Sequence, residues 1–190
     1  MNYTDYQMSR DLSWRVLLEE GVTELPVMVG DLCRNMGIRV QFYDPVDTND
    51  GFSTVVNGRA RLFVSKNCSA ERQRFTAAHE LGHILLGHVG QYQLVNREPS
   101  PRDNPIEHAA NVFASRLLAP ACVLWALNVR TPEEISDLCK ISLQAARFRA
   151  ERMAILYERG KFLSSPLERE VLKQFSDFID RQKRRGAGQE

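Results

Sequence analysis

The sequence predicts an α+β fold, in which a small three-stranded antiparallel sheet packs on a long helix carrying HELGH at residues 79–83, followed by a helical C-terminal portion. Three observations predict it. Apolar residues alternate between residues 38 and 65, around an Asn57-Gly58 pair, and this pattern indicates strands joined by a hairpin. An apolar stripe at helical spacing follows from Ser69. Capping sequences that contain proline then recur towards the C-terminus and are typical of helix starts.

Two short helices are predicted before the sheet. Residues 11–20 (DLSWRVLLEE) place apolar side chains at helical spacing. Thr23 is a suitable N-cap for the second helix, and Pro26 falls in its first turn, where the missing N–H costs nothing. We expect this helix to run to Met36, because Gly37 is a favourable residue just after a helix end.

Three strands are expected within residues 38–65. Apolar and polar residues alternate in 38–43, and two further strands are predicted at 52–56 and 59–65. Asn57-Gly58 between the last two supplies the positive φ angles of a type I′ hairpin turn. The sequence therefore predicts a small antiparallel sheet.

Helices account for most of the remaining chain. The exception is residues 89–104, which are polar and rich in proline and are expected to form a loop. A helix from about Pro105 to Leu118 follows this loop. The other expected helix starts are Ser69, Thr131 (a capping box with Glu134), Ser142 (a helix to about Tyr157) and Ser165 (a second capping box, with Glu168, before a last helix to about Arg184).

Length and charge limit the function classes. The 190 residues suit a core at residues 1–125 with a helical portion at residues 126–190 packed on it. Lys and Arg number 25 against 24 Asp and Glu, a net charge of +1, which argues against a general nucleic-acid binder. No apolar run approaches the roughly 20 residues that span a bilayer. We therefore expect no direct nucleic-acid partner and no membrane partner, and the sequence does not predict the oligomeric state.

The start of the chain and the cysteines bear on the compartment. The first residues lack the basic and then apolar pattern of an export signal. The four cysteines are widely spaced and form no CxxC motif. Without an export signal they are expected to be reduced thiols, although an even number also allows two disulfides. We therefore expect a cytoplasmic protein.

Residues 79–83 have the HExxH pattern. Residues four apart lie on the same face of a helix, so His79 and His83 can bind one zinc ion through ring nitrogens at about 2.0–2.1 Å. Glu80 is rotated away by one position, which suits a general base that acts on the attacking water. The alternative is a pair of structural histidines beside a surface glutamate.

A catalytic zinc site needs a third protein ligand. His88 lies about 140° around the helix from His83, which is more typical of a helix-end histidine that interacts with the C-terminal dipole. The acidic candidates are Glu98, Asp103 and Glu107. Glu107 lies on a predicted helix and has the better support, but a solvated carboxylate in a first helical turn remains the alternative.

Other residues are candidates for supporting roles. Asn111 lies one turn after Glu107 and can hold a zinc-binding histidine by a hydrogen bond. Tyr92, Arg102 and His108 are candidates to stabilise the oxyanion, and the sequence does not separate them.

The strand at residues 59–65 leads into the zinc helix and suggests a way to bind substrate. If it lies at the sheet edge, an extended substrate can add to it as a further strand, beside Arg59 and Arg61. Tyr92 and His108 complete the set of candidate substrate-binding residues. The alternative is that this strand only packs the sheet on the helix.

The C-terminal third allows a second interpretation. Residues 131–157 fit a helix–turn–helix pattern, and Arg147, Arg149 and Arg152 on its second helix suggest DNA binding. The neutral overall charge instead favours a helical bundle that closes the core.

Two sequence blocks resemble the ImmA/IrrE family of zinc metallopeptidases. They are FTAAHELGH at residues 75–83 and the pattern ExxANxFAxxLLxP from Glu107 to Pro120. The resemblance implies that one zinc ion per chain is bound by His79, His83 and Glu107, and that Glu80 is catalytic.

The resemblance also implies a protein substrate. This is typically a helix–turn–helix repressor encoded beside the peptidase in a phage, mobile element or stress-response locus, and its cleavage relieves repression. The alternative is a non-proteolytic binding partner of such a regulator, as in a toxin–antitoxin pair. The intact Glu80 weighs against that alternative, because binding alone needs no base.

Overall fold

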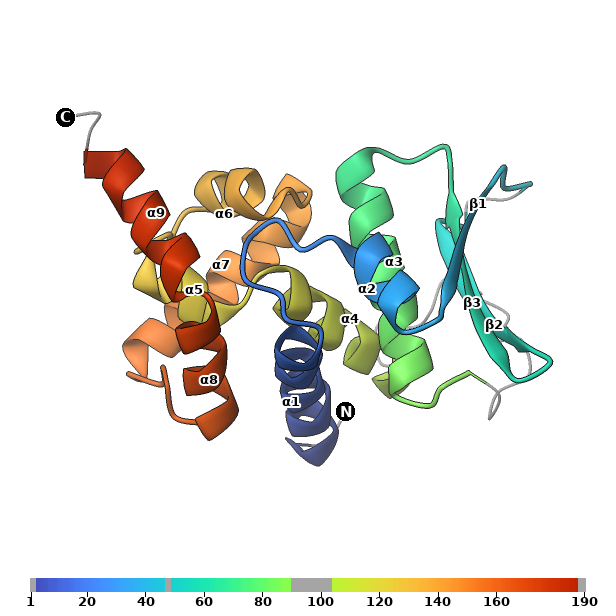
Figure 1. The fold of residues 1–190 in the computed structure, drawn as a ribbon, viewed down its shortest axis with the longest axis horizontal. Helices are drawn as coiled ribbons and strands as arrows, with labels where there is room; N and C mark the ends of the chain where they lie inside the picture. The colour runs from blue at the N-terminus through green and yellow to red at the C-terminus, as the bar shows by residue number, and fades with distance from the viewer. Residues whose placement is uncertain (1–2, 47–48, 90–103, 188–190) are drawn as a thin grey trace. The chain divides into compact units, whose positions relative to one another are not determined.

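The structure is a computed structural model that describes residues 3–46, 49–89 and 104–187. Within these ranges it confirms the α+β class (Figure 1). The helices are α1 (Tyr3–Glu19), α2 (Val29–Asn35), α3 (Ala70–Leu85), α4 (Pro105–Leu118), α5 (Ala121–Ala126), α6 (Pro132–Cys139), α7 (Leu143–Glu158), α8 (Pro166–Gln174) and α9 (Ser176–Ala187). The strands are β1 (Arg39–Tyr43), β2 (Gly51–Val56) and β3 (Arg59–Ser65).

The chain divides into two compact units. The first comprises Met1–Leu12 and Met28–Ala114, and the second comprises Ser13–Val27 and Ser115–Glu190. These boundaries differ from the predicted domains, 1–125 and 126–190, and that domain division stays a prediction. The sheet and the HELGH residues belong to the first unit.

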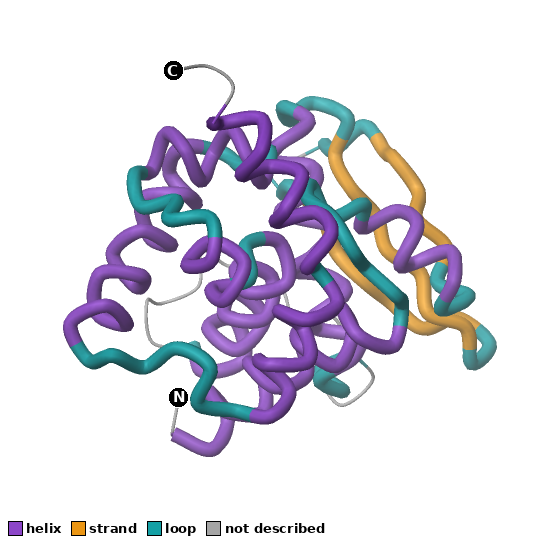
Figure 2. Tube along the Cα trace, turned by 60° about the vertical axis from the view of Figure 1, so that its left-hand side comes forward, coloured by secondary structure: helices purple, strands orange, loops and turns teal. Residues whose placement is uncertain are grey.

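The sheet is mixed, so the predicted antiparallel sheet is wrong in one of its two pairings. The strand order is β1-β3-β2, with β3 parallel to β1 and antiparallel to β2. The chain reverses direction after β1 and again at the hairpin, so β1 and β3 run the same way. The hairpin places β3 between β2 and β1, so the parallel strands β1 and β3 are neighbours. Figure 2 shows the three strands lying side by side.

The two faces of the sheet have different side chains, as the alternation along each strand requires. Leu62 and Val64 of β3 are almost completely buried on the face that packs on α3. Aromatic rings gather on the opposite face. Phe52 stacks on Phe63 with ring centroids 4.5 Å apart, and Tyr43 meets Phe52 edge-on at 5.5 Å.

The predicted turn and several helix ends are confirmed. Asn57 and Gly58 have φ angles of 52° and 71°, as a type I′ hairpin requires. The Ser69 hydroxyl accepts a hydrogen bond from the Arg72 N–H at 3.3 Å and caps α3. Thr131 and Glu134 form the predicted capping box of α6.

Other helix limits differ from prediction. α1 begins at Tyr3 rather than near residue 11. α2 begins at Val29, so Thr23 is not its N-cap. Leu25 and Val27 are buried although they precede the helix, which means that their apolar character reflects packing rather than helical structure.

The predicted last helix, from Ser165 to about Arg184, is divided into α8 and α9 at Phe175. Its predicted capping box is also wrong. Ser165 makes no side-chain capping hydrogen bond, and Glu168 accepts from the N–H of Ser164 at 3.2 Å instead of from the N-cap residue.

The predicted helix–turn–helix region corresponds to α6 and α7 in the second unit. Arg149 of α7 is 2% exposed, and its Nε donates a hydrogen bond to the Ala119 carbonyl at 2.7 Å. A buried arginine in this position holds two helical segments together and does not present its charge to DNA. This contact favours the helical-bundle interpretation.

One described stretch, Pro105–Ala126, is long and apolar enough to cross a membrane by length and composition, and 72% of its apolar 18-residue part is buried. No apolar run of about this length is expected from the sequence, in which the helix from Pro105 ends near Leu118. Buried core helices have the same composition, so the stretch is weak evidence for a membrane.

Candidate metal centre

Helix α3 places two imidazoles side by side. His79 and His83 lie one turn apart and are buried, with 9% and 6% of each residue exposed. Their Nε2 atoms are 3.0 Å apart. The spacing of four residues therefore directs both ring nitrogens at the same point, as the sequence predicts.

Helix α4 supplies a carboxylate at this point. Glu107 lies in the first turn of α4, where the Asn104 side chain accepts a hydrogen bond from the N–H of Ile106 at 3.0 Å and orders the helix start. The Glu107 carboxylate oxygens lie 3.2 Å from the Nε2 of His79 and 3.4 Å from the Nε2 of His83.

The donor set and its spacing suit zinc. Ligands at about 2.0–2.1 Å around a tetrahedral ion lie about 3.3 Å from one another. The three donor pairs of His79, His83 and Glu107 are 3.0, 3.2 and 3.4 Å apart. Two imidazoles and a carboxylate are also a donor set that catalytic zinc uses, with one position left open.

The charge state of Glu107 fits the same role. Hydrogen bonds with the imidazoles of His79 and His83 hold the pKa of this carboxyl well below its usual range, although burial acts in the opposite direction. The carboxylate is therefore ionised at neutral pH, as a metal ligand must be.

Each histidine has a second contact on its far nitrogen. The Nδ1 of His79 lies 3.0 Å from the Asn111 side-chain oxygen, and the Nδ1 of His83 lies 3.0 Å from the Nδ1 of His88. If the Nε2 atoms bind an ion, each Nδ1 carries the proton and donates it to this partner. Burial lowers the pKa of His88 to about 4, which keeps this ring neutral and able to accept.

Glu80 lies beside the donors but makes a different contact. It is 1% exposed, and the Ser53 hydroxyl of strand β2 donates a hydrogen bond to its Oε2 at 2.9 Å. Ser53 lies on the face of edge strand β2 that is turned towards α3, so its hydrogen bond helps to orient the Glu80 carboxylate.

Gly82 lets the two helices approach. A Cβ at this position would lie 2.9 Å from the Cδ1 of Phe113 and 3.4 Å from the Cα of Ala110, both on α4. The absence of a side chain thus lets α4 come close enough for Glu107 to reach the two histidines.

Among the candidate substrate residues, the structure describes Arg59, Arg61 and His108, and their role with substrate stays a prediction. Arg59 and Arg61 alternate with Leu62 and so point to the face of the sheet opposite α3. Strand β3 is paired on both sides, so the condition for adding substrate to it, an edge position in the sheet, is not met, and this favours the alternative that β3 packs the sheet on the helix. The exposed His108 lies about 100° around α4 from Glu107.

Some candidates lie outside the described residues: Tyr92, Glu98, Arg102 and Asp103. Two contributors are not predicted from the sequence. Ser53 is predicted only as part of a strand, although a polar residue on the inward face of a strand is a signal for a contact with the helix below. His88 is predicted only as a ligand or a helix-end residue and not as a partner of His83.

Comparisons with known proteins are consistent with this arrangement. The profile of the IrrE N-terminal-like domain (Peptidase_M78) matches residues 33–151. A solved structure of a Mycobacterium tuberculosis transcriptional regulator is similar, with a TM-score of 0.56 and 19% identity, over 75% of this chain and 46% of that chain. This chain thus spans about half the length of that regulator, and the likeness shows the fold alone. No curated protein matches the sequence.

Proposed function

The chain belongs to the IrrE N-terminal-like (Peptidase_M78) family, and from this premise we propose that it is a zinc-dependent endopeptidase that cleaves a helix–turn–helix transcriptional repressor. The observation that carries the proposal is the triangle of donor atoms from His79, His83 and Glu107, with Glu80 buried beside it. A chain that only bound a partner would need neither this donor geometry nor the carboxylate.

The proposed roles follow from the contacts. His79, His83 and Glu107 would hold the zinc ion, which when bound activates water and polarises a carbonyl. Glu80 removes the proton from the attacking water and passes it to the leaving amine, as a general base and then acid. Ser53 keeps the Glu80 carboxylate in place, and Asn111 and His88 hold the two imidazole rings.

The substrate is the least constrained part of the proposal. Its support is the resemblance of both sequence blocks to the ImmA/IrrE peptidases, and the similarity in fold to a protein described as a transcriptional regulator. The same proposal places the protein in the cytoplasm, with its repressor encoded nearby in a phage, mobile element or stress-response locus.

The test compares zinc-loaded wild type with Glu80→Gln. Each is incubated with the helix–turn–helix repressor encoded closest to its gene, and separately with a proteome-derived peptide library whose new N-termini are identified by mass spectrometry. We expect wild type alone to cut the repressor at one or a few bonds. Cleavage of library peptides but not of the repressor would contradict the proposal that the repressor is the substrate. If wild type leaves both the repressor and the library intact, the proposed peptidase activity is wrong. Binding of the intact repressor by wild type and by Glu80→Gln would then indicate the non-proteolytic alternative.

A further inference from the structure

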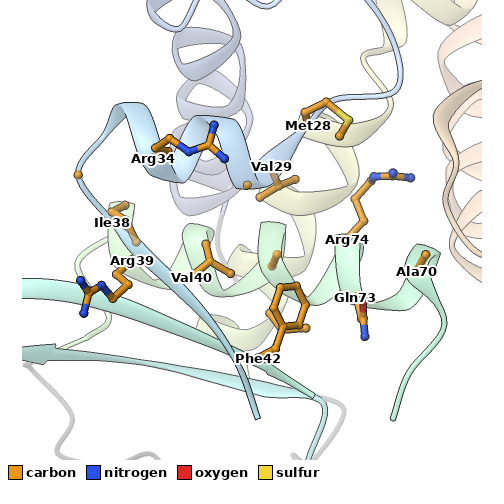
Figure 3. A pocket seen from close by; sticks show the side chains of 14 residues that line it. Met28, Val29, Arg34, Ile38, Arg39, Val40, Phe42, Ala70, Gln73 and Arg74 are labelled. Carbon is orange, nitrogen blue, oxygen red and sulfur yellow. The ribbon is translucent and has the colours of Figure 1, made fainter. Parts of the chain in front are cut away.

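The sheet meets helix α3 differently at its two edges, and all of these elements belong to the first unit. At edge strand β1, a groove of about 660 Å³ lies between the strand, α2 and α3, and Val40 and Phe42 point into it (Figure 3). At the start of edge strand β2, the strand instead packs tightly on α3. Gly51, the first residue of β2, is buried at this contact.

Gly51 has no room for a side chain. A Cβ at this position would lie 2.5 Å from the Cγ2 of Thr76 on α3 and 2.6 Å from the backbone carbonyl oxygen of Phe63 on β3. Both distances are far shorter than an ordinary van der Waals contact. The φ angle of Gly51 is not positive, so the backbone conformation does not require glycine here. The close approach of α3 and β3 is therefore the reason for a glycine in this strand.

The same position lies beside the proposed general base. A Cβ at residue 51 would lie 3.7 Å from the Cγ of Glu80, which is one helical turn after Thr76 on the same face of α3. Ser53 is the next inward residue of β2, and its hydroxyl donates a hydrogen bond to the Oε2 of Glu80 at 2.9 Å. Two successive inward positions of β2 thus face the stem and the carboxylate of one side chain.

We propose that Gly51 is a positioning residue for Glu80 and that it acts by setting the distance between β2 and α3. This role rests on the proposed function, in which Glu80 is the general base. A methyl group at residue 51 must displace β2 by about 1 Å to restore ordinary contact distances. The Ser53 hydroxyl moves with the strand, and a hydrogen bond of 2.9 Å that lengthens by this amount is lost.

Gly51→Ala tests this role in the zinc-loaded 190-residue chain, with the library peptide that wild type cuts fastest as the substrate. We expect kcat to fall about 10–100-fold, because a catalytic group misplaced by about 1 Å loses up to this much in rate. KM should change less than about twofold, and the zinc affinity should stay the same because none of the three donors changes. Val56→Gly is the matched control. It weakens the same strand on its opposite face and should leave kcat unchanged.

A second substitution separates positioning from a general loss of stability. Thr76→Ser removes the Cγ2 that meets the new methyl group, so Gly51→Ala combined with Thr76→Ser should recover at least about threefold in kcat over Gly51→Ala alone. The recovery is incomplete because the contact with the Phe63 carbonyl oxygen remains. If Gly51 had only a structural role, Thr76→Ser would lower the stability further, because it deletes a buried methyl group, and kcat would not recover.

Crystal structures of wild type and Gly51→Ala give a measurement that does not depend on cleavage. We expect the distance from the Ser53 Oγ to the Glu80 Oε2 to exceed about 3.5 Å in the variant. An unchanged distance, a wild-type kcat in Gly51→Ala, or an equal loss of kcat in Val56→Gly would show that Gly51 does not position Glu80. If Gly51→Ala does not fold, the double variant takes its place, and a wild-type kcat in it has the same meaning. A wild-type chain that cuts no peptide contradicts the proposed function, and the two crystal structures then decide the role of Gly51.

Discussion

At the level of single residues, the two histidines of α3 are held by different partners. Asn111 accepts from His79 through a side-chain oxygen, whereas His88 faces His83 through a ring nitrogen. Both partners act on the nitrogen that faces away from the Glu107 carboxylate. They therefore fix the direction in which each lone pair points, which decides how well the three donors converge.

Removing either partner should weaken metal binding without abolishing it. We expect Asn111→Ala and His88→Ala each to lower the zinc affinity by about 10–100-fold, measured by competition with a chromophoric chelator. His88→Gln keeps an acceptor and should recover part of the loss. His108→Ala, an exposed position on α4, is the control. Unchanged affinity in the first two variants would show that these contacts do not orient the rings.

Ser53→Ala removes the hydroxyl that donates to Glu80. We expect kcat to fall about tenfold while zinc affinity stays the same, because a hydrogen bond to a charged group is lost but no metal donor changes. Thr54→Ala, on the opposite face of β2, should leave kcat unchanged. Equal effects of the two substitutions on kcat, or loss of zinc in Ser53→Ala alone, would contradict a positioning role.

The sequence predicts part of this site for clear physical reasons. Helical spacing is enough to place His79 and His83 on one face, and Glu80 beside them. Spacing alone does not show whether Glu107 is the third ligand, because local sequence patterns do not predict how α4 crosses α3. The family resemblance resolves this choice. The contact of Ser53 with Glu80 joins residues 27 positions apart and depends on strand register, which local patterns do not specify.

At the level of elements, the approach of α4 to α3 depends on Gly82. Glycine weakens a helix by about 1 kcal/mol relative to alanine, so its place in the middle of α3 needs a compensating reason. The short distance to Phe113 gives that reason. The lower helix propensity of Gly82 is offset because the missing side chain lets α3 and α4, which carry the donor atoms, lie close together.

Gly82→Ala should therefore destabilise the protein even though alanine favours helices. A new methyl group 2.9 Å from Phe113 forces a shift, and overpacking of this kind costs about 1–3 kcal/mol. Gly30→Ala in α2 is the matched control, because a Cβ there meets nothing within 4 Å, and it should stabilise by up to about 1 kcal/mol. Urea unfolding measures both. A stabilising effect of Gly82→Ala would show that the contact between α3 and α4 accommodates a methyl group and does not require glycine.

Elements defined by local signals are predicted well, whereas those decided by pairing are not. The Asn57-Gly58 turn and the Ser69 and Ser142 caps depend on neighbouring residues and are confirmed. The parallel pairing of β1 with β3 is missed because alternation shows which residues are inside but not which strands are neighbours. The early start predicted for α2, at Thr23, fails because buried apolar residues outside a helix can imitate its spacing.

At the level of the whole molecule, none of the four cysteines forms a disulfide, and three of them are buried: Cys33 in the first unit, and Cys122 and Cys139 in the second. Burial raises the pKa of Cys33, in the first unit, and of Cys122, in the second, to about 12 from an ordinary value of 9. Cysteines outside any disulfide agree with the predicted reduced thiols, while the compartment stays a prediction.

These thiols make stability depend on pH in the alkaline range. Because the pKa of Cys33 is higher in the folded state than in the unfolded state, its contribution is complete below pH 9 and is lost as the pH rises from 9 towards 12. The free energy of unfolding should therefore fall more steeply between pH 9 and pH 12 in wild type than in Cys33→Ala. Equal slopes would show that the buried thiol does not titrate on unfolding in this range.

His79, His83 and Glu107 bind one zinc ion in the proposed site, and Glu80 does not help to hold it. Isothermal titration of the metal-free 190-residue chain with zinc tests this assignment. We expect one ion per chain in wild type and in Glu80→Gln, and loss of this binding in His79→Ala and in Glu107→Ala. Zinc binding that survives in Glu107→Ala, or that is absent from a folded wild-type chain, would contradict it.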